Sequence, residues 1–205
     1  MDMFFEGNER KELEKRMMEK GRLPPGQALT LKWPVLHYGS VPHFDPAQWE
    51  FKIFGLVDKP ARLSWDELNN LPKSQLTSDF HCVTRWSLFD NRWDGVLFRD
   101  VLELVTLKPS AKYVLVHAEQ GFTANVPLAD LDRPEVIFAT HHDNQPLPPE
   151  HGYPLQLIVP HLYAWKSVKW ARGIEFFDHD VPGFWEQNGY HMYGDPWKEQ
   201  RFDTD

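Results

Sequence analysis

The feature that most constrains the fold is the shortness of the apolar runs, which are separated by prolines and polar turns. The chain has 205 residues and 17 prolines, and its apolar runs have the alternation or the length of strands. Examples are "WEFKIFGLV" (49–57), "SQLTSDFHCV" (74–83), "EVIFATHH" (135–142), "YPLQLIVP" (153–160) and "SVKWARGIEFFD" (167–178). The pattern predicts an α+β fold with a mixed, mostly-β core and short helices rather than a βαβ succession.

Local signals place the short helices and one hairpin. "SWDELNNLP" (64–72) predicts a helix, because Ser64 and Glu67 form a capping box and a proline ends the run. "FRDVLELV" (98–105) has the apolar spacing of a second helix. "AKYVLVHA" and "FTANVPL" flank "EQG" (119–121) and predict a β-hairpin.

The N-terminal part of the chain has a different character. Residues 8–20 predict a charged helix that begins at Asn8, and the five prolines of 21–46 predict an extended segment. We therefore expect two regions, an N-terminal helix with an extended arm over 1–32 and one domain over 33–205.

Composition excludes several classes of function. The formal net charge of −8 argues against nucleic-acid binding, because phosphates recruit Lys and Arg. No apolar run approaches the roughly 20 residues that a membrane span needs. The first residues lack the order of a signal peptide, so we expect a cytoplasmic protein without a membrane span. One cysteine allows neither an internal disulfide nor a cysteine-cluster metal site.

The single cysteine, Cys82, stands in "FHCVTRWS" (80–87) at the end of a predicted strand. A lone cysteine is commonly a small buried apolar residue. The alternative is a thiolate that acts as a nucleophile or a metal ligand, favoured by the positive charge of His81 and Arg85 nearby. The residues alone leave both readings open.

Histidines suggest a second kind of site. His141 and His142 precede Asp143, and with His151 they form the donor set of a metal-dependent hydrolase hypothesis. Neighbouring residues of a strand point to opposite faces, which makes it difficult for the first two to bind one ion. The lysines of "AWKSVKW" (164–170) offer a third possibility, the binding of an anion such as phosphate.

These signals occur in an order that resembles one known family. The motifs "HCVTRWS", "WDGVLFRDVL", "DNQPLPPEHGYPLQLIVP" and "YAWKSVKW" are similar to those of the sulfite oxidase and methionine sulfoxide reductase family of molybdopterin enzymes. The resemblance covers about residues 33–193. It implies a sulfite oxidase-like molybdopterin-binding fold and an oxidoreductase that transfers an oxygen atom and two electrons.

The resemblance also implies roles for particular residues. Cys82 matches the cysteine whose thiolate binds molybdenum, a pairing that suits a soft ligand. Tyr190 falls near an active-site tyrosine of the sulfite oxidases, and Arg85 is a candidate hydrogen-bond donor to the transferred oxygen. The residues that match the molybdopterin-binding positions are His37, Tyr38, Cys82, His151, Ala164, Trp165, Lys166, Ser167 and Lys169.

Departures from the family pattern bear on the substrate. Sulfite oxidases carry arginines where this chain has Val35, Ser87 and Gln156. We therefore expect a less basic pocket, with an aromatic rim that suits a small, neutral S- or N-oxide. The rim would be built from Trp86, Trp93, Trp185 and Tyr190. Electrons would pass to or from a separate protein partner.

Two alternatives to the molybdopterin oxidoreductase remain from the sequence. One is a pterin-binding fold without redox activity that serves as a binding module. The other is the hydrolase built on the histidines and Asp143. Metal analysis separates the three hypotheses. The oxidoreductase predicts molybdenum, the binding module predicts no metal, and the hydrolase predicts zinc.

Overall fold

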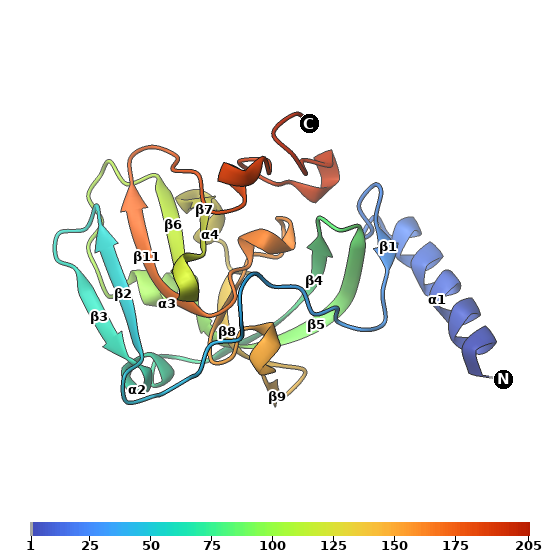
Figure 1. Cartoon of the computed structure of the whole chain (residues 1–205), viewed down its shortest axis with the longest axis horizontal. Helices are drawn as coiled ribbons and strands as arrows, with labels where there is room; N and C mark the ends of the chain where they lie inside the picture. Colours follow the sequence, from blue (N-terminus) through green and yellow to red (C-terminus); the bar gives the residue numbers. More distant parts are fainter. Residues whose placement is uncertain (1) are drawn as a thin grey trace.

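The molecule is built on two sheets, seen side by side in Figure 1. The computed structural model describes residues 2–205, with side chains from Asn8 onward. The first sheet contains β1 (Ala28–Leu29), β4 (Ser74–Cys82), β5 (Trp86–Leu97), β8 (Ile137–His142), β9 (Gln145–Pro146) and β10 (Gln156–Ile158). The second contains β2 (Glu50–Gly55), β3 (Ala61–Ser64), β6 (Tyr113–Ala118), β7 (Thr123–Pro127) and β11 (Ala171–Phe177).

Strand pairing in both sheets is mixed. The first sheet is centred on β5, which pairs antiparallel with β4 and β8 and parallel with β1. The second has the order β3-β2-β11-β6-β7, in which β11 and β2 are parallel and the other pairs antiparallel. The fold is therefore α+β with a mixed, mostly-β core, as the sequence predicts.

The helices are few and short, apart from the first. They are α1 (Asp2–Glu19), α2 (Trp65–Asn69), α3 (Phe98–Leu102) and α4 (Leu128–Leu131). Single 3₁₀ turns occur at η1 (Glu119–Gly121), η2 (Pro149–His151), η3 (Ala164–Lys166), η4 (Glu186–Asn188) and η5 (Pro196–Lys198). No helix within residues 2–205 has both the length and the apolar character that crossing a membrane requires.

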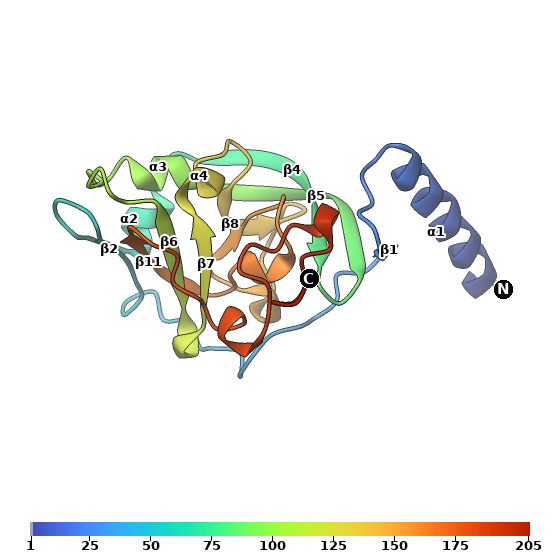
Figure 2. The same ribbon diagram turned by 90° about the horizontal axis from the view of Figure 1, so that it is seen from above.

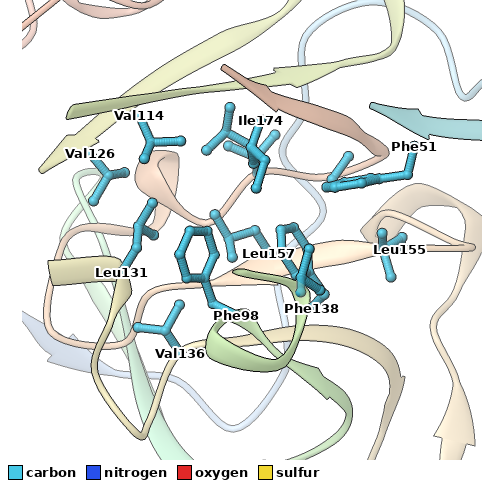
Figure 3. Close-up of a cluster of buried hydrophobic side chains, with 14 of the residues drawn as sticks. Phe51, Phe98, Val114, Val126, Leu131, Val136, Phe138, Leu155, Leu157 and Ile174 are labelled. Atoms are coloured by element: carbon cyan, nitrogen blue, oxygen red, sulfur yellow. The ribbon is translucent and has the colours of Figure 1, made fainter. Parts of the chain in front are cut away.

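The main core lies between the sheets and is closed by α3 and α4. Figure 3 shows Val114 and Ile174 of the second sheet facing Phe138 and Leu157 of the first, with Phe98 of α3 between them. All five side chains are at most 1% exposed. Burial of this apolar surface is the main favourable contribution to folding.

Several local predictions are confirmed. Helix α2 begins after Ser64, whose hydroxyl accepts from the Glu67 N–H while the Glu67 carboxylate accepts from the Ser64 N–H. Strands β6 and β7 form the predicted hairpin around Glu119–Gly121. Strand β5, at 12 residues the longest strand among the described residues, is not predicted from the sequence.

The N-terminal helix projects from the body of the molecule (Figures 1 and 2). It begins at Asp2, so Asn8 lies inside the helix and the prediction that Asn8 starts it is wrong. Met17 and Leu29 bury themselves together where the helix meets the arm. The Arg22 guanidinium then binds the carboxylates of Asp79 and Asp90, which fixes the arm to the β4–β5 hairpin.

Candidate active site

A cavity of about 360 Å³ lies where four segments meet. They are the extended segment 21–46, here called the arm, the β4–β5 turn, the segment around η3, and the C-terminal tail after β11 (178–205). A volume of this order is typical of small-molecule sites. Eight of the predicted catalytic and cofactor-binding residues line it: His37, Tyr38, Cys82, Ala164, Trp165, Ser167, Lys169 and Tyr190. Trp86 and Trp185 of the predicted aromatic rim line it as well. The structure therefore brings together side chains that are up to 153 positions apart in the chain (37 to 190).

Cys82 is the last residue of β4 and is buried at the cavity wall. Its sulfur lies 3.1 Å from the Thr84 hydroxyl. The turn that follows is held through its carbonyl groups, because the Cys82 carbonyl accepts from the Gln27 amide and the Val83 carbonyl accepts from Arg201. The arm and the tail thus fix the position of the thiol from two sides.

The charge state of the thiol depends on opposing effects. Burial raises the pKa of Cys82, because the thiolate loses hydration. Hydrogen bonds from Thr84 and the positive charges of Lys169 and Arg201 lower that pKa but do not cancel the effect of burial. A bound metal ion would remove the proton outright, since a coordinating thiol is deprotonated.

Lys169 is the one Lys or Arg among the described residues at the cavity wall. Its ammonium donates to the Leu36 carbonyl of the arm and to the Glu150 carbonyl, each at 2.8 Å. Burial lowers the pKa of Lys169 to about 8. The two carbonyl groups use two of the three N–H donors of the Lys169 ammonium, which leaves one for an anion in the cavity.

The arm and the tail close the cavity with aromatic rings. Tyr38 of the arm packs on Phe184 of the tail with ring centroids 4.4 Å apart. Tyr190 packs against Trp185 at 4.9 Å and against Trp165 at 5.2 Å. Burial raises the pKa of Tyr190, so its hydroxyl keeps its proton at neutral pH and is a hydrogen-bond donor.

Lys166 does not line the cavity. Its side chain is fully buried and its ammonium lies 2.6 Å from the Glu186 carboxylate, 2.7 Å from the Asn125 side-chain oxygen and 2.7 Å from the Met192 carbonyl. These acceptors use its three N–H donors. In this geometry the ammonium has no N–H left for a pterin phosphate, and the role of Lys166 in cofactor binding stays a prediction.

Three further predicted residues lie away from the cavity wall. His151 is buried one layer behind it, with its ring stacked on Trp33 at 3.9 Å. Arg85 has a left-handed backbone (φ 71°), is exposed, and its guanidinium lies against Gly26, so it does not face the cavity. Trp93 is fully buried in a hydrophobic cluster with Phe80, Ile137 and Ile158, and it forms no part of an aromatic rim.

The donors of the hydrolase hypothesis do not converge. His142 bonds to the Asn91 side chain, and His141 bonds to Thr140. Within residues 2–205 no group of three or more His, Cys, Asp or Glu side chains is arranged to hold a metal ion. His141 and His142 thus bond to neighbouring side chains rather than converging on a metal ion.

Sequence reasoning missed three residues that support the site, two of which lie outside the motifs. Arg201 is 3% exposed and holds the cysteine turn from the last five residues of the chain. Glu186 is buried as the partner of Lys166 and Trp165. Thr84 lies inside the motif "HCVTRWS", but nothing in its residue type marks it. Only the three-dimensional contacts identify these three residues.

Comparison with a solved structure agrees with the architecture. The crystal structure of the sulfane dehydrogenase SoxCD from Paracoccus pantotrophus superposes with a TM-score of 0.64 at 21% identity. The match covers 70% of this chain and 41% of the SoxCD chain. The molecule therefore shares the mixed-sheet fold of that structure.

The sequence comparisons identify the family. Residues 38–185 match the family described as "Oxidoreductase molybdopterin binding domain". The uncharacterized oxidoreductase YuiH of Bacillus subtilis is 48% identical, over 91% of this chain and 95% of its own. A sulfite oxidase of Arabidopsis thaliana is 27% identical over 83% of this chain. The chain belongs to the molybdopterin-binding oxidoreductase family, and the predicted enzyme class and cofactor are confirmed.

The coverage of the relatives differs. The chain spans almost all of YuiH but only 54% of the Arabidopsis sulfite oxidase and 54% of the Gluconobacter oxydans protein-methionine-sulfoxide reductase catalytic subunit MsrP. None of these matches bears on the compartment, so a cytoplasmic location stays a prediction.

The residues of the cavity fit molybdenum and its pterin. A buried thiol at the wall is the soft ligand that such a metal takes, and Lys169 provides a cation for a phosphate. Two polar atoms of cavity-lining residues, the Gln156 side-chain oxygen and the Trp86 N–H, are buried without a hydrogen-bond partner. Such groups are costly unless paired, and a polar cofactor would supply partners.

Proposed function

We propose that the protein transfers an oxygen atom between a small, uncharged S- or N-oxide and water and exchanges two electrons with a separate protein partner. In the reducing direction the oxide takes up two electrons and two protons, and it yields the reduced compound and one water. The proposal deepens the family assignment, which fixes the cofactor and the enzyme class but not the substrate.

Residues of the cavity wall would bind the metal, the pterin and the oxide. Cys82 would hold the metal through its thiolate, and the pterin would lie among His37, Tyr38, Trp165, Ser167 and Lys169. The bound cofactor supplies the two-electron redox change that oxygen-atom transfer requires. Tyr190 keeps its proton and would donate a hydrogen bond to the oxygen of the oxide, while the surrounding rings exclude water.

The observation that carries the choice of substrate is the scarcity of charge at the cavity wall. Among the described residues that line it, Lys169 is the one Lys or Arg, whereas eight aromatic side chains contribute: Trp33, Tyr38, Phe80, Trp86, Phe122, Trp165, Trp185 and Tyr190. A dianion such as sulfite needs several cationic partners in a closed site, because unpaired buried charge costs several kcal/mol.

The relatives support both a neutral oxide and a separate partner. The Gluconobacter protein is named a protein-methionine-sulfoxide reductase catalytic subunit, and one from Azospira oryzae is named a putative subunit of such an enzyme. A sulfoxide is a neutral oxide, and the word subunit implies a second protein. The Arabidopsis relative favours sulfite as the second candidate substrate.

Metal analysis and steady-state assays test the proposal. Protein made in a host that synthesises molybdopterin should contain about one Mo per chain. It should reduce dimethyl sulfoxide, free methionine sulfoxide or trimethylamine N-oxide with a reduced viologen dye. Cys82→Ser should lose Mo and activity while it unfolds as the Mo-free wild type does, because a cofactor bound only to the folded state adds to its stability. A sulfite kcat/KM above about 10⁵ M⁻¹s⁻¹ would overturn the choice of substrate, and Mo-free wild-type protein would overturn the proposal entirely.

A further inference from the structure

The thiol of Cys82 has a neighbour that the family assignment does not explain. The Thr84 hydroxyl lies 3.1 Å from the Cys82 sulfur, and Thr84 also lines the cavity. No other side-chain hydrogen bond of Thr84 is found among the described residues. The hydroxyl is therefore free to orient its hydrogen toward the sulfur.

The direction of this hydrogen bond follows from the chemistry of the two groups. A thiol and a hydroxyl can each donate, but a thiolate has no proton and can only accept. When the sulfur binds a metal it is a thiolate, so the Thr84 hydroxyl becomes the donor. A hydrogen bond to an ionised acceptor is about twice as strong as one between neutral groups.

The turn that carries both residues is held in place. The Cys82 carbonyl accepts from the Gln27 amide at 2.9 Å and from the Arg85 N–H at 3.0 Å, and the Val83 carbonyl accepts from Arg201 at 2.7 Å. Both peptide units that separate the sulfur from the hydroxyl are therefore fixed. Preorganisation of this kind keeps a supporting group in register with the group that it supports.

We propose that Thr84 is a positioning residue that donates its hydroxyl to the Cys82 thiolate and thereby withdraws electron density from the sulfur that binds molybdenum. The inference rests on the proposed role of Cys82. Hydrogen bonds to ligand sulfurs orient the ligand and set the reduction potential of the bound metal. Thr84 would thus tune the site without touching the substrate.

Three variants of the loaded enzyme test this inference. Thr84→Val keeps the shape and removes the donor, Thr84→Ser keeps the donor, and Thr77→Val makes the same change at an exposed position of β4. Thr84 is itself exposed, so the valine opens no buried cavity. Thermal unfolding of each variant verifies that the fold is retained.

The expected results concern the metal rather than activity alone. Thr84→Val should release Mo about 10-fold faster on dialysis, in the range found when a partner of a metal ligand is removed. Its sulfur-to-metal charge-transfer absorption should move to longer wavelength, and its reduction potential should fall, because the sulfur regains electron density. Thr84→Ser and Thr77→Val should behave as the wild type.

Each contrary result has a definite meaning. Wild-type protein without Mo would overturn the proposed function and, with it, this inference. Mo-loaded wild type with a Thr84→Val variant of the same absorption, potential and Mo retention would overturn the inference alone. Equal changes in Thr84→Val and Thr84→Ser would attribute the effect to the methyl group and would also overturn it.

Discussion

Lys166 and Lys169 lie three positions apart but have different partners: Lys166 is buried against Glu186, whereas Lys169 lines the cavity. Replacing each with methionine should therefore affect different properties, stability in the first case and cofactor binding in the second. Lys166→Met leaves Glu186 as an unpaired buried charge, which typically costs about 3–5 kcal/mol. Lys169→Met removes a cation at the cavity wall and should lower cofactor affinity about 10-fold, the equivalent of about 1.4 kcal/mol. Urea unfolding and Mo content per chain measure the two effects.

The double substitution Lys166→Met with Glu186→Gln provides the control. It removes both charges and should recover much of the stability that Lys166→Met loses, because no unpaired charge remains. An unchanged unfolding free energy in Lys166→Met, together with loss of Mo, would instead restore Lys166 to its sequence-predicted role as a phosphate ligand.

Two buried histidines, His81 and His151, should make the stability of the protein depend on pH, because burial lowers the pKa of each. Burial lowers the pKa of His151 from 6.5 to about 4; the charges of Lys169, His142 and His37 add to this shift, and the Glu150 carboxylate opposes it. The unfolded chain then binds more protons than the folded one between these two values, so the unfolding free energy falls as pH drops from 6.5 to 4.

Replacing His151 with phenylalanine should weaken this dependence. The ring keeps the stacking on Trp33 but cannot titrate, so the unfolding free energy of His151→Phe should change less between pH 7 and 4.5 than that of the wild type. Urea unfolding followed by tryptophan fluorescence at several pH values measures it. Parallel curves for the two proteins would show that His151 titrates normally in the folded state.

At the level of single residues, the motifs predict which residues lie near the cavity better than they predict which groups contact each side chain. Cys82, Ser167 and Lys169 all line the cavity, as the resemblance implies. Lys166 has the right residue type and chain position, but its surroundings depend on Glu186 and Asn125, which come from other segments. A sequence of separate motifs does not show which acceptors converge on a given ammonium group.

At the level of elements, a helix or hairpin is predicted from the sequence where the contacts that stabilise it join residues close together in the chain. The start of α2 is fixed by contacts between Ser64 and Glu67, three positions apart, and the β6–β7 hairpin by a three-residue turn. Strand β5 has no such local contact: its partners are β4 and the distant β8. Sequence patterns accordingly do not predict this strand.

The cap of α2 gives a measurable consequence of this local control. Ser64→Ala removes the side-chain acceptor for the Glu67 N–H and should lower the unfolding free energy by about 1 kcal/mol. The neighbouring Asp66→Ala substitution, which leaves both capping contacts in place, should cost less. Equal losses from the two substitutions in urea unfolding would show that the capping contacts contribute little to α2.

At the level of the whole molecule, the cavity exists because the arm and the C-terminal tail converge on it. The arm contributes His37 and Tyr38, and the tail contributes Trp185 and Tyr190. Figures 1 and 2 both show the tail lying across the body near the β4–β5 hairpin. Sequence patterns predict neither convergence, because arm and tail have no regular periodicity and are fixed by single contacts.

Arg201 is the contact through which the tail reaches the cysteine turn. Its guanidinium donates to the Val83 carbonyl at 2.7 Å and lies 4.9 Å from the centre of the Tyr163 ring. Arg201→Met keeps most of the apolar stem but leaves that carbonyl without its side-chain donor. We expect a loss of about 1–3 kcal/mol in unfolding free energy and faster hydrogen exchange of the backbone amides of residues 83–86.

The exposed Lys198 lies on the same tail and provides the matched control. Its side chain is 68% exposed and is 3.6 Å from the Asp195 carboxylate, an ion pair of little energetic weight at the surface. Lys198→Met should therefore change neither the unfolding free energy beyond about 0.5 kcal/mol nor the exchange of the cysteine turn. If Arg201→Met also left the exchange of residues 83–86 unchanged, the tail would cover the cavity without holding Cys82 in position, and the arm alone, through Gln27, would have to do so.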